Sequence, residues 1–175
     1  MDFSKLVKER YSVRKFLDKA VEKDKLKLIL EAARIAPTAA NKQPQRILVL
    51  ERDAELKKLD LCTSGRFGAP AAFIVCYDST ACWVRTYDGE KAGVVDASIV
   101  TTQMMLQACD LGLGTTWVMY FDPVKIRKEF AIPGTIIPVA VLPLGYPAPD
   151  ATPADFHYHR EAPEKTIFYN QFPAS

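Results

Sequence analysis

The heptad Arg10-Tyr11-Ser12-Val13-Arg14-Lys15-Phe16 sets two arginines four positions apart, with a hydroxyl side chain between them. A guanidinium group is always charged and presents a planar fork of N–H donors, which suits phosphate recognition. Ser12 adds a short donor that can lie beside a phosphate oxygen. The heptad therefore predicts an anion-binding site, and a solvated basic turn is the alternative that its residues leave open.

Helical patterns flank the heptad on both sides. Residues 2–9 predict a short helix with one apolar face, and residues 24–35 predict a second helix. Asp24 is the expected cap of that second helix, and Pro37 closes it because the residue before a proline leaves helical geometry. The heptad is thus expected in a connection between two helices, where binding residues often occur.

Size and charge restrict the class of protein. The 175 residues are 49% hydrophobic, which predicts one domain over residues 1–175 with its own core. A net charge of +2, from 23 basic and 21 acidic residues, argues against nucleic acid or an anionic membrane as the main partner. The start of the chain lacks a secretory signal and no apolar run reaches membrane-spanning length, so a cytoplasmic location is expected.

Cysteine and histidine patterns predict no metal site. The four cysteines show no metal-ligand spacing, and Cys76 and Cys109 lie in apolar or helical contexts that are typical of buried thiols. The two histidines, His157 and His159, are two apart near the end of the chain, where surface residues are the usual interpretation. Neither histidine belongs to a recognisable Ser-His-Asp arrangement.

Strand and helix patterns are mixed along the rest of the chain. Strands are predicted at 46–50, 71–77, 115–120 and 136–144, and helices at 53–61, 90–111 and 122–130. Regular βαβ alternation, a GxGxxG turn and a phosphate loop are all missing, so a dinucleotide is not held in the familiar way. The helix at 90–111 carries so little charge that burial nearly all round is expected, inside the domain or at a subunit interface.

Two segments are harder to interpret. Residues 78–89 carry Trp83, Arg85 and Tyr87, which predict either part of a lid or a loop anchored by its two aromatics. Residues 148–175 combine four prolines with several aromatics and few aliphatics. Such a segment cannot build a core alone, and a C-terminal arm that packs on a partner subunit is expected.

Four motifs occur in order: Arg10–Arg14, Ala36–Pro44 (Ala-Pro-Thr-Ala-Ala-Asn-Lys-Gln-Pro), Gly112–Trp117 (Gly-Leu-Gly-Thr-Thr-Trp) and Leu142–Pro147 (Leu-Pro-Leu-Gly-Tyr-Pro). This ordered set resembles the signatures of the nitroreductase family. The resemblance implies an α+β fold with a central mixed, mainly antiparallel sheet flanked by helices. It also implies an intimate homodimer, with FMN in each of two clefts at the interface and the C-terminal arm extended onto the partner.

The resemblance also implies roles for individual residues. Arg10, Ser12 and Arg14 would hold the phosphate and ribityl chain, with Tyr11 contributing mainly backbone and Arg160 completing the phosphate site. The flavin ring would be contacted from the partner chain by Pro37, Thr38, Ala39, Asn41 and Gln43, and from the first chain by Gly114, Thr115, Thr116 and Trp117. The amides of Asn41 and Gln43 suit the pyrimidine edge of the ring.

Each role has a structural alternative. Arg14 could pair with Asp18 one helical turn later, and Arg160 could pair with Glu161 or Glu164. Asn41 could simply shape its turn, and the two threonines are ordinary strand residues.

The activity implied is FMN-dependent reduction of nitroaromatics, quinones or similar flat acceptors by NADH or NADPH, in a ping-pong hydride mechanism that needs no catalytic side chain. Narrower flavin chemistry such as reductive dehalogenation, and non-catalytic flavin binding, are the alternatives. The sequence departs from many relatives at Gln45, where they have an aromatic, and at Tyr11, where they have a second arginine. The chain is also short, so an open substrate cleft is expected.

Overall fold

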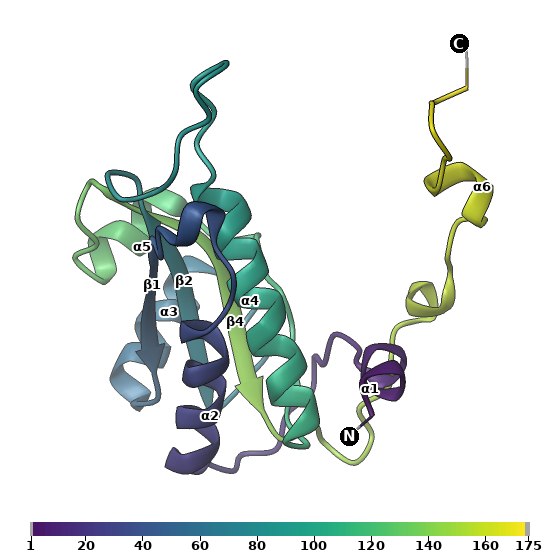
Figure 1. Ribbon diagram of the computed structural model, residues 1–175. Helices are drawn as coiled ribbons and strands as arrows, with labels where there is room; N and C mark the ends of the chain where they lie inside the picture. The colour runs from purple at the N-terminus through teal and green to yellow at the C-terminus, as the bar shows by residue number, and fades with distance from the viewer. Residues whose placement is uncertain (1, 174–175) are drawn as a thin grey trace.

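The fold is a sheet between two layers of helices, and the computed structural model describes residues 2–173 of it (Figure 1). The strands are β1 (Gln45–Leu50), β2 (Ala71–Asp78), β3 (Gly114–Thr115) and β4 (Ile136–Gly145). Their spatial order is β1-β2-β4-β3, and all three neighbouring pairs are antiparallel. An isolated bridge between Ser12 and Thr115 is parallel, so the mixed, mainly antiparallel sheet is confirmed.

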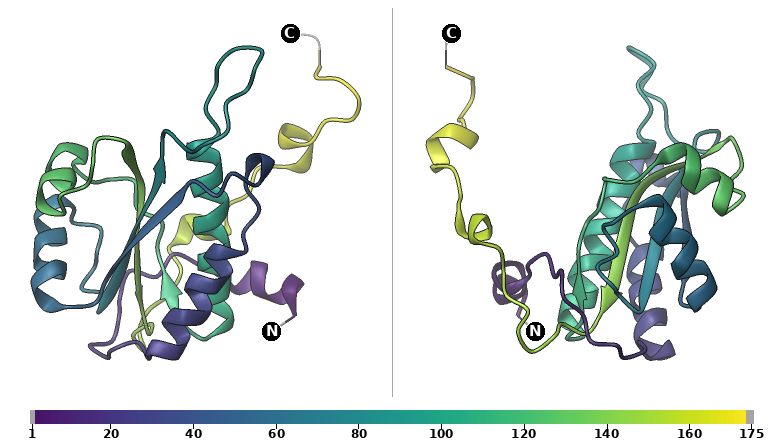
Figure 2. Two further views of the ribbon diagram at one scale, coloured as in Figure 1. Left: turned by 60° about the vertical axis from the view of Figure 1, so that its left-hand side comes forward. Right: turned by 180° about the vertical axis from the view of Figure 1, so that it is seen from behind.

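Helices cover both faces of the sheet. The helices of the described chain are α1 (Phe3–Glu9), α2 (Lys23–Arg34), α3 (Asp53–Cys62), α4 (Gly93–Asp110), α5 (Pro123–Glu129) and α6 (Pro163–Thr166), with 3-10 turns η1 (Ala39–Asn41) and η2 (Asp155–Tyr158). Helices α2 and α4 lie on one face, and α3 and α5 lie on the other (Figures 1 and 2). None of the helices within residues 2–173 has the length and hydrophobicity that crossing a membrane requires.

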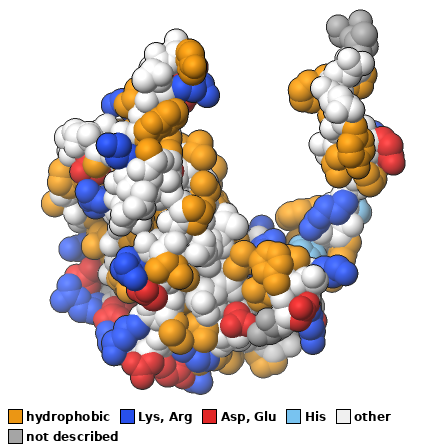
Figure 3. Space-filling model, viewed as in Figure 1, with side chains coloured by type: hydrophobic (Ala, Val, Ile, Leu, Met, Phe, Trp, Pro, Cys, Tyr) orange, Lys and Arg blue, Asp and Glu red, His pale blue; other side chains and the backbone are white. Residues whose placement is uncertain are grey.

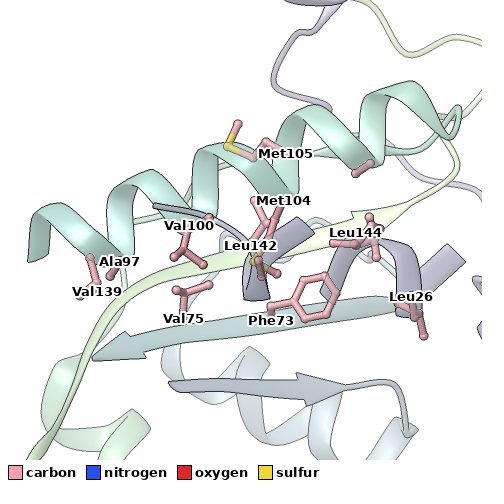
Figure 4. Close-up of a cluster of buried hydrophobic side chains, with 14 of the residues drawn as sticks. Leu26, Phe73, Val75, Ala97, Val100, Met104, Met105, Val139, Leu142 and Leu144 are labelled. Carbon is pink, nitrogen blue, oxygen red and sulfur yellow. The ribbon is translucent and has the colours of Figure 1, made fainter. Parts of the chain in front are cut away.

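Strand β2 joins the two layers because it is buried on both faces. Phe73 and Val75 point toward α2 and α4, where they meet Met104 and Val100 (Figure 4). The alternate residues, such as Ile74, join a second cluster with α3 and α5. This alternation follows from the two-residue period of a strand, which sends successive side chains to opposite faces.

The predicted strand at 115–120 is wrong in length, because β3 ends at Thr115. The β3–β4 register continues to an isolated bridge between Val118 and Val141, so Thr116 falls opposite Pro143. Proline has no N–H to donate to the ladder, which interrupts the pairing at that position.

The helix predictions are confirmed in position, and the observed termini lie within three residues of the predicted ones. Helix α2 begins at Lys23 after the cap residue Glu22, so Asp24 lies in the first turn and pairs with Lys27 at 3.1 Å. Helix α4 begins at Gly93 rather than at residue 90. At the other end of α4, Gly112 takes the left-handed conformation, with φ of +74°, that ends a helix.

The expected burial of α4 on all sides is not seen in the single chain. One face, with Ala97, Val100 and Met104, is fully buried. The opposite face exposes apolar side chains, including Val95 at 59%. These side chains line a groove of about 880 Å³ together with apolar residues of α1 and α2, such as Phe3.

The C-terminal segment leaves the body of the protein as an arm. It carries η2 and α6 and rises away from the sheet and its helices, as Figure 1 and the right view of Figure 2 show. Every described residue from 159 to 173 is exposed. A wide gap separates the arm from the body, and hydrophobic side chains are exposed along the arm (Figure 3).

Candidate functional site

The heptad is held as an extra extended segment at the end of the sheet. The Val13 N–H donates to the Thr115 carbonyl at 3.0 Å. On the other side of the heptad, the Ala148 N–H donates to the Lys15 carbonyl at 3.0 Å, and the Leu17 N–H donates to the Tyr146 carbonyl at 2.9 Å. The donors of the heptad are therefore carried by backbone that is fixed on two sides.

Gly114 allows this close approach. A Cβ at position 114 would lie 2.5 Å from Cγ2 of Val13, a separation that real Cβ atoms do not show. The buried Thr116 hydroxyl also donates to the Val13 carbonyl, across 103 residues of sequence. Gly114 and Thr116 thus hold the heptad against the sheet at Val13. This gives the Gly112–Trp117 motif a structural role in addition to any contact with a ligand.

The arginines of the heptad have no carboxylate partner. Within residues 2–173, Arg34, Arg46, Arg52, Arg66 and Arg85 form ion pairs with aspartate or glutamate. Arg10, Arg14 and Arg160 form none, which excludes the pairing of Arg14 with Asp18 and of Arg160 with the glutamates that follow it. Arg14 donates to the Ser12 carbonyl at 3.3 Å and lies 5.8 Å from the ring of Phe156.

The third cation of the heptad is neutralised. Lys15 pairs with Asp150 at 2.7 Å, and this hydrogen bond lowers the pKa of the Asp150 carboxyl. Glu9, which lies next to Arg10 in sequence, is held by Lys5 at 3.7 Å instead. The positive charge that remains uncompensated on this segment is that of the two arginines, which is the arrangement an anion requires.

A cavity of about 210 Å³ lies beside the heptad. It is lined by Arg10 and Tyr11 from the heptad, by Cys109 at the end of α4, and by Gly114 and Pro147. Burial raises the pKa of the Cys109 thiol and of the Tyr11 phenol, so both are neutral at pH 7. The Tyr11 hydroxyl donates to the Ala151 carbonyl at 3.1 Å, which directs this side chain toward the arm and leaves its backbone at the cavity.

The second predicted group of site residues forms a strained loop after α2. Asn41 and Gln43 have positive φ angles of 52° and 49°, and so does Ala40 at 48°. The Thr38 hydroxyl accepts from the Gln43 N–H at 3.0 Å, and the side-chain amide of Gln43 donates to that of Asn41 at 3.2 Å. The amides of Asn41 and Gln43 are exposed, as are Pro37 and Lys42, so the loop presents polar groups outward.

The loop and the heptad lie at opposite ends of α4. The Ala39 N–H donates to Asp96 in the first turns of this helix, whereas Cys109 at its other end lines the heptad cavity. Helix α4 has 18 residues, which corresponds to a length of about 27 Å. One chain therefore does not bring the two groups of residues together.

The remaining predicted residues divide between these positions. Thr115 and Thr116 are buried against the heptad, and Trp117 is half-buried against the cluster beneath α2 and α4. Arg160 lies on the arm, where its guanidinium donates to the carbonyls of His157 and His159. The His157 ring lies 6.4 Å from the ring of Tyr11, so the turn before Arg160 approaches the heptad.

The segment 78–89 projects from the body as a narrow loop (Figure 1). It is closed by a bridge between Val84 and Lys91, and Arg85 pairs with Asp88 at 2.5 Å near its tip. Tyr87 is 96% exposed, so it does not anchor the loop to its own chain. A role as a lid stays a prediction.

Sequence reasoning missed three contributors to the heptad site. Cys109 and Pro147 line its cavity, and Ala148 supplies a backbone N–H that fixes the heptad. Each comes from a segment far from residue 10 in sequence. Pro147 belongs to the motif Leu142–Pro147, but nothing in the composition of that motif indicates that it lies beside the N-terminal segment.

Comparison with known proteins agrees with this geometry. The model of the family described as "Nitroreductase family" matches residues 7–146, most of the chain. The chain belongs to the nitroreductase family. Both the heptad and the loop at 38–43 fall inside the matched region, whereas the arm with Arg160 lies beyond it.

Individual family members extend the likeness to most of the chain. A protein of Methanothermobacter thermautotrophicus, provisionally named NADH dehydrogenase/NAD(P)H nitroreductase, is 36% identical over 85% of this chain and 78% of its own. The crystal structure of a nitroreductase family protein from Clostridium difficile 630 is 40% identical, with a TM-score of 0.92 over 98% of this chain and 100% of that one. A further structure, named FMN-dependent nitroreductase, from Clostridium difficile R20291 is 28% identical, with a TM-score of 0.78 over 95% and 98%. The α+β nitroreductase fold is thereby confirmed.

Proposed function

We propose that this nitroreductase family protein is an FMN-dependent oxidoreductase that uses NADH or NADPH to reduce flat acceptors such as nitroaromatics and quinones. The observation that carries the proposal is the pair Arg10 and Arg14, which have no carboxylate partner among residues 2–173 and are fixed beside Ser12 at the end of the sheet. The names of the relatives support the oxidoreductase class and, for one of them, dependence on FMN.

The donor set of the chain fits FMN at both ends of that molecule. Two guanidinium groups and the Ser12 hydroxyl suit a phosphate ester, since charge-assisted and bidentate hydrogen bonds to phosphate are strong. Asn41 and Gln43 offer exposed amides that suit the donors and acceptors of the ring edge. Arg160 would reach the phosphate from the arm, whose preceding turn already contacts the heptad through Phe156.

A homodimer is part of this proposal, and the separation of these groups supports it. The loop at 38–43 and the heptad lie at opposite ends of α4, so a second copy is needed to bring one loop to the other heptad. The apolar groove of about 880 Å³ along α4 and the exposed arm offer surfaces that a second copy would bury. Each assembly would then contain two equivalent sites.

The protein binds and orients, while the cofactor carries the chemistry. Bound FMN would supply the redox chemistry, which is acceptance of hydride from NADH or NADPH and then delivery of that hydride to an acceptor. The acceptor would bind after the nicotinamide has left, so the cycle would be of the ping-pong type. The arginines hold the phosphate and so fix the position of the ring. Donors from the loop would stabilise negative charge at the pyrimidine edge. Thr115 and Thr116 support the heptad from the core, and no side chain is assigned as an acid or base.

Anaerobic reduction tests the proposal. Purified protein is loaded with FMN, mixed with NADH or NADPH without oxygen, and followed by the loss of the yellow absorbance. We expect bleaching within the mixing time and recovery of colour on addition of a nitroaromatic or a quinone. Colour that persists with both nicotinamides would indicate a flavin-storage protein, and recovery only with a halogenated aromatic would indicate a dehalogenase. A protein that refuses FMN would contradict the proposal entirely.

A further inference from the structure

The loop at 38–43 adopts a conformation that its own residues do not favour. Ala40, Asn41 and Gln43 all have φ angles near +50°, in the left-handed region. Left-handed backbone is costly for residues other than glycine, and asparagine tolerates it better than alanine because its side chain can hydrogen-bond locally. Such a loop persists only where its surroundings hold it in place.

Most of the hydrogen bonds of the loop are local. The Asn41 N–H donates to the Thr38 carbonyl at 2.9 Å, and the Lys42 N–H donates to the Ala39 carbonyl at 3.1 Å. Among residues 2–173, the one hydrogen bond that joins the loop to a sequence-distant element runs from the Ala39 N–H to Oδ1 of Asp96, at 2.8 Å and 57 residues away.

Asp96 is unusual in its own right. It is 1% exposed, and the other buried residues that the structure describes carry no charged side chain. Its second oxygen, Oδ2, has no hydrogen-bond partner among those residues. A buried carboxylate with an unfilled oxygen is costly, so its retention calls for an explanation beyond packing. Its place in the first turns of α4, near the positive end of the helix dipole, offsets part of that cost.

We propose that Asp96 is a positioning residue for the flavin-facing loop. Its Oδ1 fixes the Ala39 N–H, and this anchor holds Asn41 and Gln43 in the left-handed conformations that present their amides. This inference rests on the proposed function for its consequence in flavin binding. The anchoring itself is a property of the folded chain and can be measured without flavin.

Because Oδ2 of Asp96 has no hydrogen-bond partner among the described residues, substitutions can test the role of Oδ1 separately. In Asp96→Asn, the amide oxygen can still accept from Ala39, and the amide nitrogen replaces an oxygen that has no donor to lose. In Asp96→Ala the acceptor is removed. Thr101→Val on the same helix is the matched control, because it deletes a buried hydroxyl that bonds to the Ala97 carbonyl and does not contact the loop.

The measurements are hydrogen–deuterium exchange across residues 36–44 and the dissociation constants of FMN and riboflavin. We expect Asp96→Ala to speed exchange of the Ala39 amide about tenfold or more and to weaken both flavins by a similar factor, since the loop contacts the ring they share. Asp96→Asn and Thr101→Val should stay within about twofold of the wild type. If Asp96→Ala does not fold, Asp96→Ser decides the question, because its hydroxyl falls about one bond length short of the Ala39 N–H.

Three results would overturn the inference: unchanged exchange in Asp96→Ala, equal loss in Asp96→Asn, or a loss confined to FMN. The last would assign Asp96 to the phosphate end of the site. A wild-type protein that binds neither flavin refutes the proposed function alone, and the exchange rates still decide whether Asp96 holds the loop.

Discussion

The N–H of Val13 donates to the carbonyl of Thr115 at 3.0 Å, and this bond makes the N-terminal heptad a neighbour of β3. The contact is parallel, unlike the strand pairs of the sheet. Because the heptad is anchored by backbone, its arginines project from a fixed support and need little ordering when an anion binds.

The first prediction concerns the hydroxyl that closes this contact. Thr116→Val removes the donor to the Val13 carbonyl at a buried position, so the free energy of unfolding should fall by about 1–3 kcal/mol. Thr115→Val is the control, because Thr115 is equally buried but acts through its backbone. Urea denaturation of both variants checks this, and equal losses would show that the hydroxyl bond has no special role.

The second prediction separates phosphate from ring recognition. Arg10→Gln and Arg14→Gln should each weaken FMN binding about 10- to 100-fold, since each removes a charge-assisted hydrogen bond. Binding of riboflavin, which lacks the phosphate, should change little. Fluorescence titration of both flavins measures the difference.

Arg127→Gln is the matched control for these variants, because Arg127 also lacks a carboxylate partner in the described part of the chain and donates to the Pro133 carbonyl at 3.1 Å. Equal loss of FMN and riboflavin in the heptad variants would argue against a phosphate role. Loss of FMN in the control would point to general electrostatics.

The third prediction uses the thiol in the heptad cavity. Burial raises the pKa of Cys109 above its ordinary value, so its thiolate fraction should reach one half at a higher pH than that of an unfolded thiol, whose pKa is about 8.5. Alkylation by iodoacetamide should follow this fraction, and FMN should slow it if the cofactor covers the cavity. Cys76, whose pKa burial raises to about 11, should react only after unfolding.

Mass spectrometry of the alkylated peptides assigns each rate to its cysteine. A midpoint for Cys109 at or below the ordinary thiol pKa of about 8.5 would show that the thiol is more solvated than the structure indicates. Equal rates with and without FMN would place the cofactor elsewhere.

The fourth prediction concerns two copies that complement each other. An Arg10→Gln/Arg14→Gln chain and an Asn41→Ala/Gln43→Ala chain should each be weakly active. After mixing and reassortment, half of the dimers are mixed, and each mixed dimer has one intact site, so about a quarter of wild-type activity should return. Activity that merely averages the two parents would mean that each chain builds its site alone.

The fifth prediction concerns the arm. Residues 159–173 are exposed, so a chain that ends at Tyr158 should keep its own core and its helical circular dichroism. The same chain should associate more weakly, because Phe168 and Phe172, whose ring centroids lie 5.2 Å apart on the exposed arm, would no longer reach a second copy. Sedimentation velocity measures this, and an unchanged mass would assign the association to α4 alone.

Local chemistry made much of the fold predictable. An aspartate followed by a proline is typical of a helix start, and the Asp122 carboxylate accepts from the N–H groups of Val124 and Lys125 at 2.9 Å, at the beginning of α5. A glycine is typical of a helix end, because the left-handed conformation that Gly112 takes after α4 favours glycine. Signals of this kind act within a few residues and can be read without the rest of the chain.

Non-local effects account for the errors. The strand after Gly114 is short because Pro143 lies opposite Thr116, and such pairing is invisible before the register is known. Helix α4 has an apolar circumference, but periodicity does not distinguish a core from a surface that awaits a partner.

The candidate site was partly predictable, because some of its features are local in sequence and others depend on long-range packing. The spacing of Arg10 and Arg14 indicated an anion site from donor chemistry alone. The contribution of Cys109 and the anchoring by Asp96 both depend on α4 lying between segments distant in sequence.

The bond between residues 13 and 115 also has a consequence for biosynthesis. The heptad leaves the ribosome early, yet its support at Gly114 to Thr116 is translated about a hundred residues later. The end of the protein that we propose binds an anion is therefore expected to be among the last parts to form, since a contact so distant along the chain closes only after its loop entropy has been overcome. Nascent chains that end before Gly114 should therefore be unable to bind a phosphate ester, even when α1 and α2 have formed.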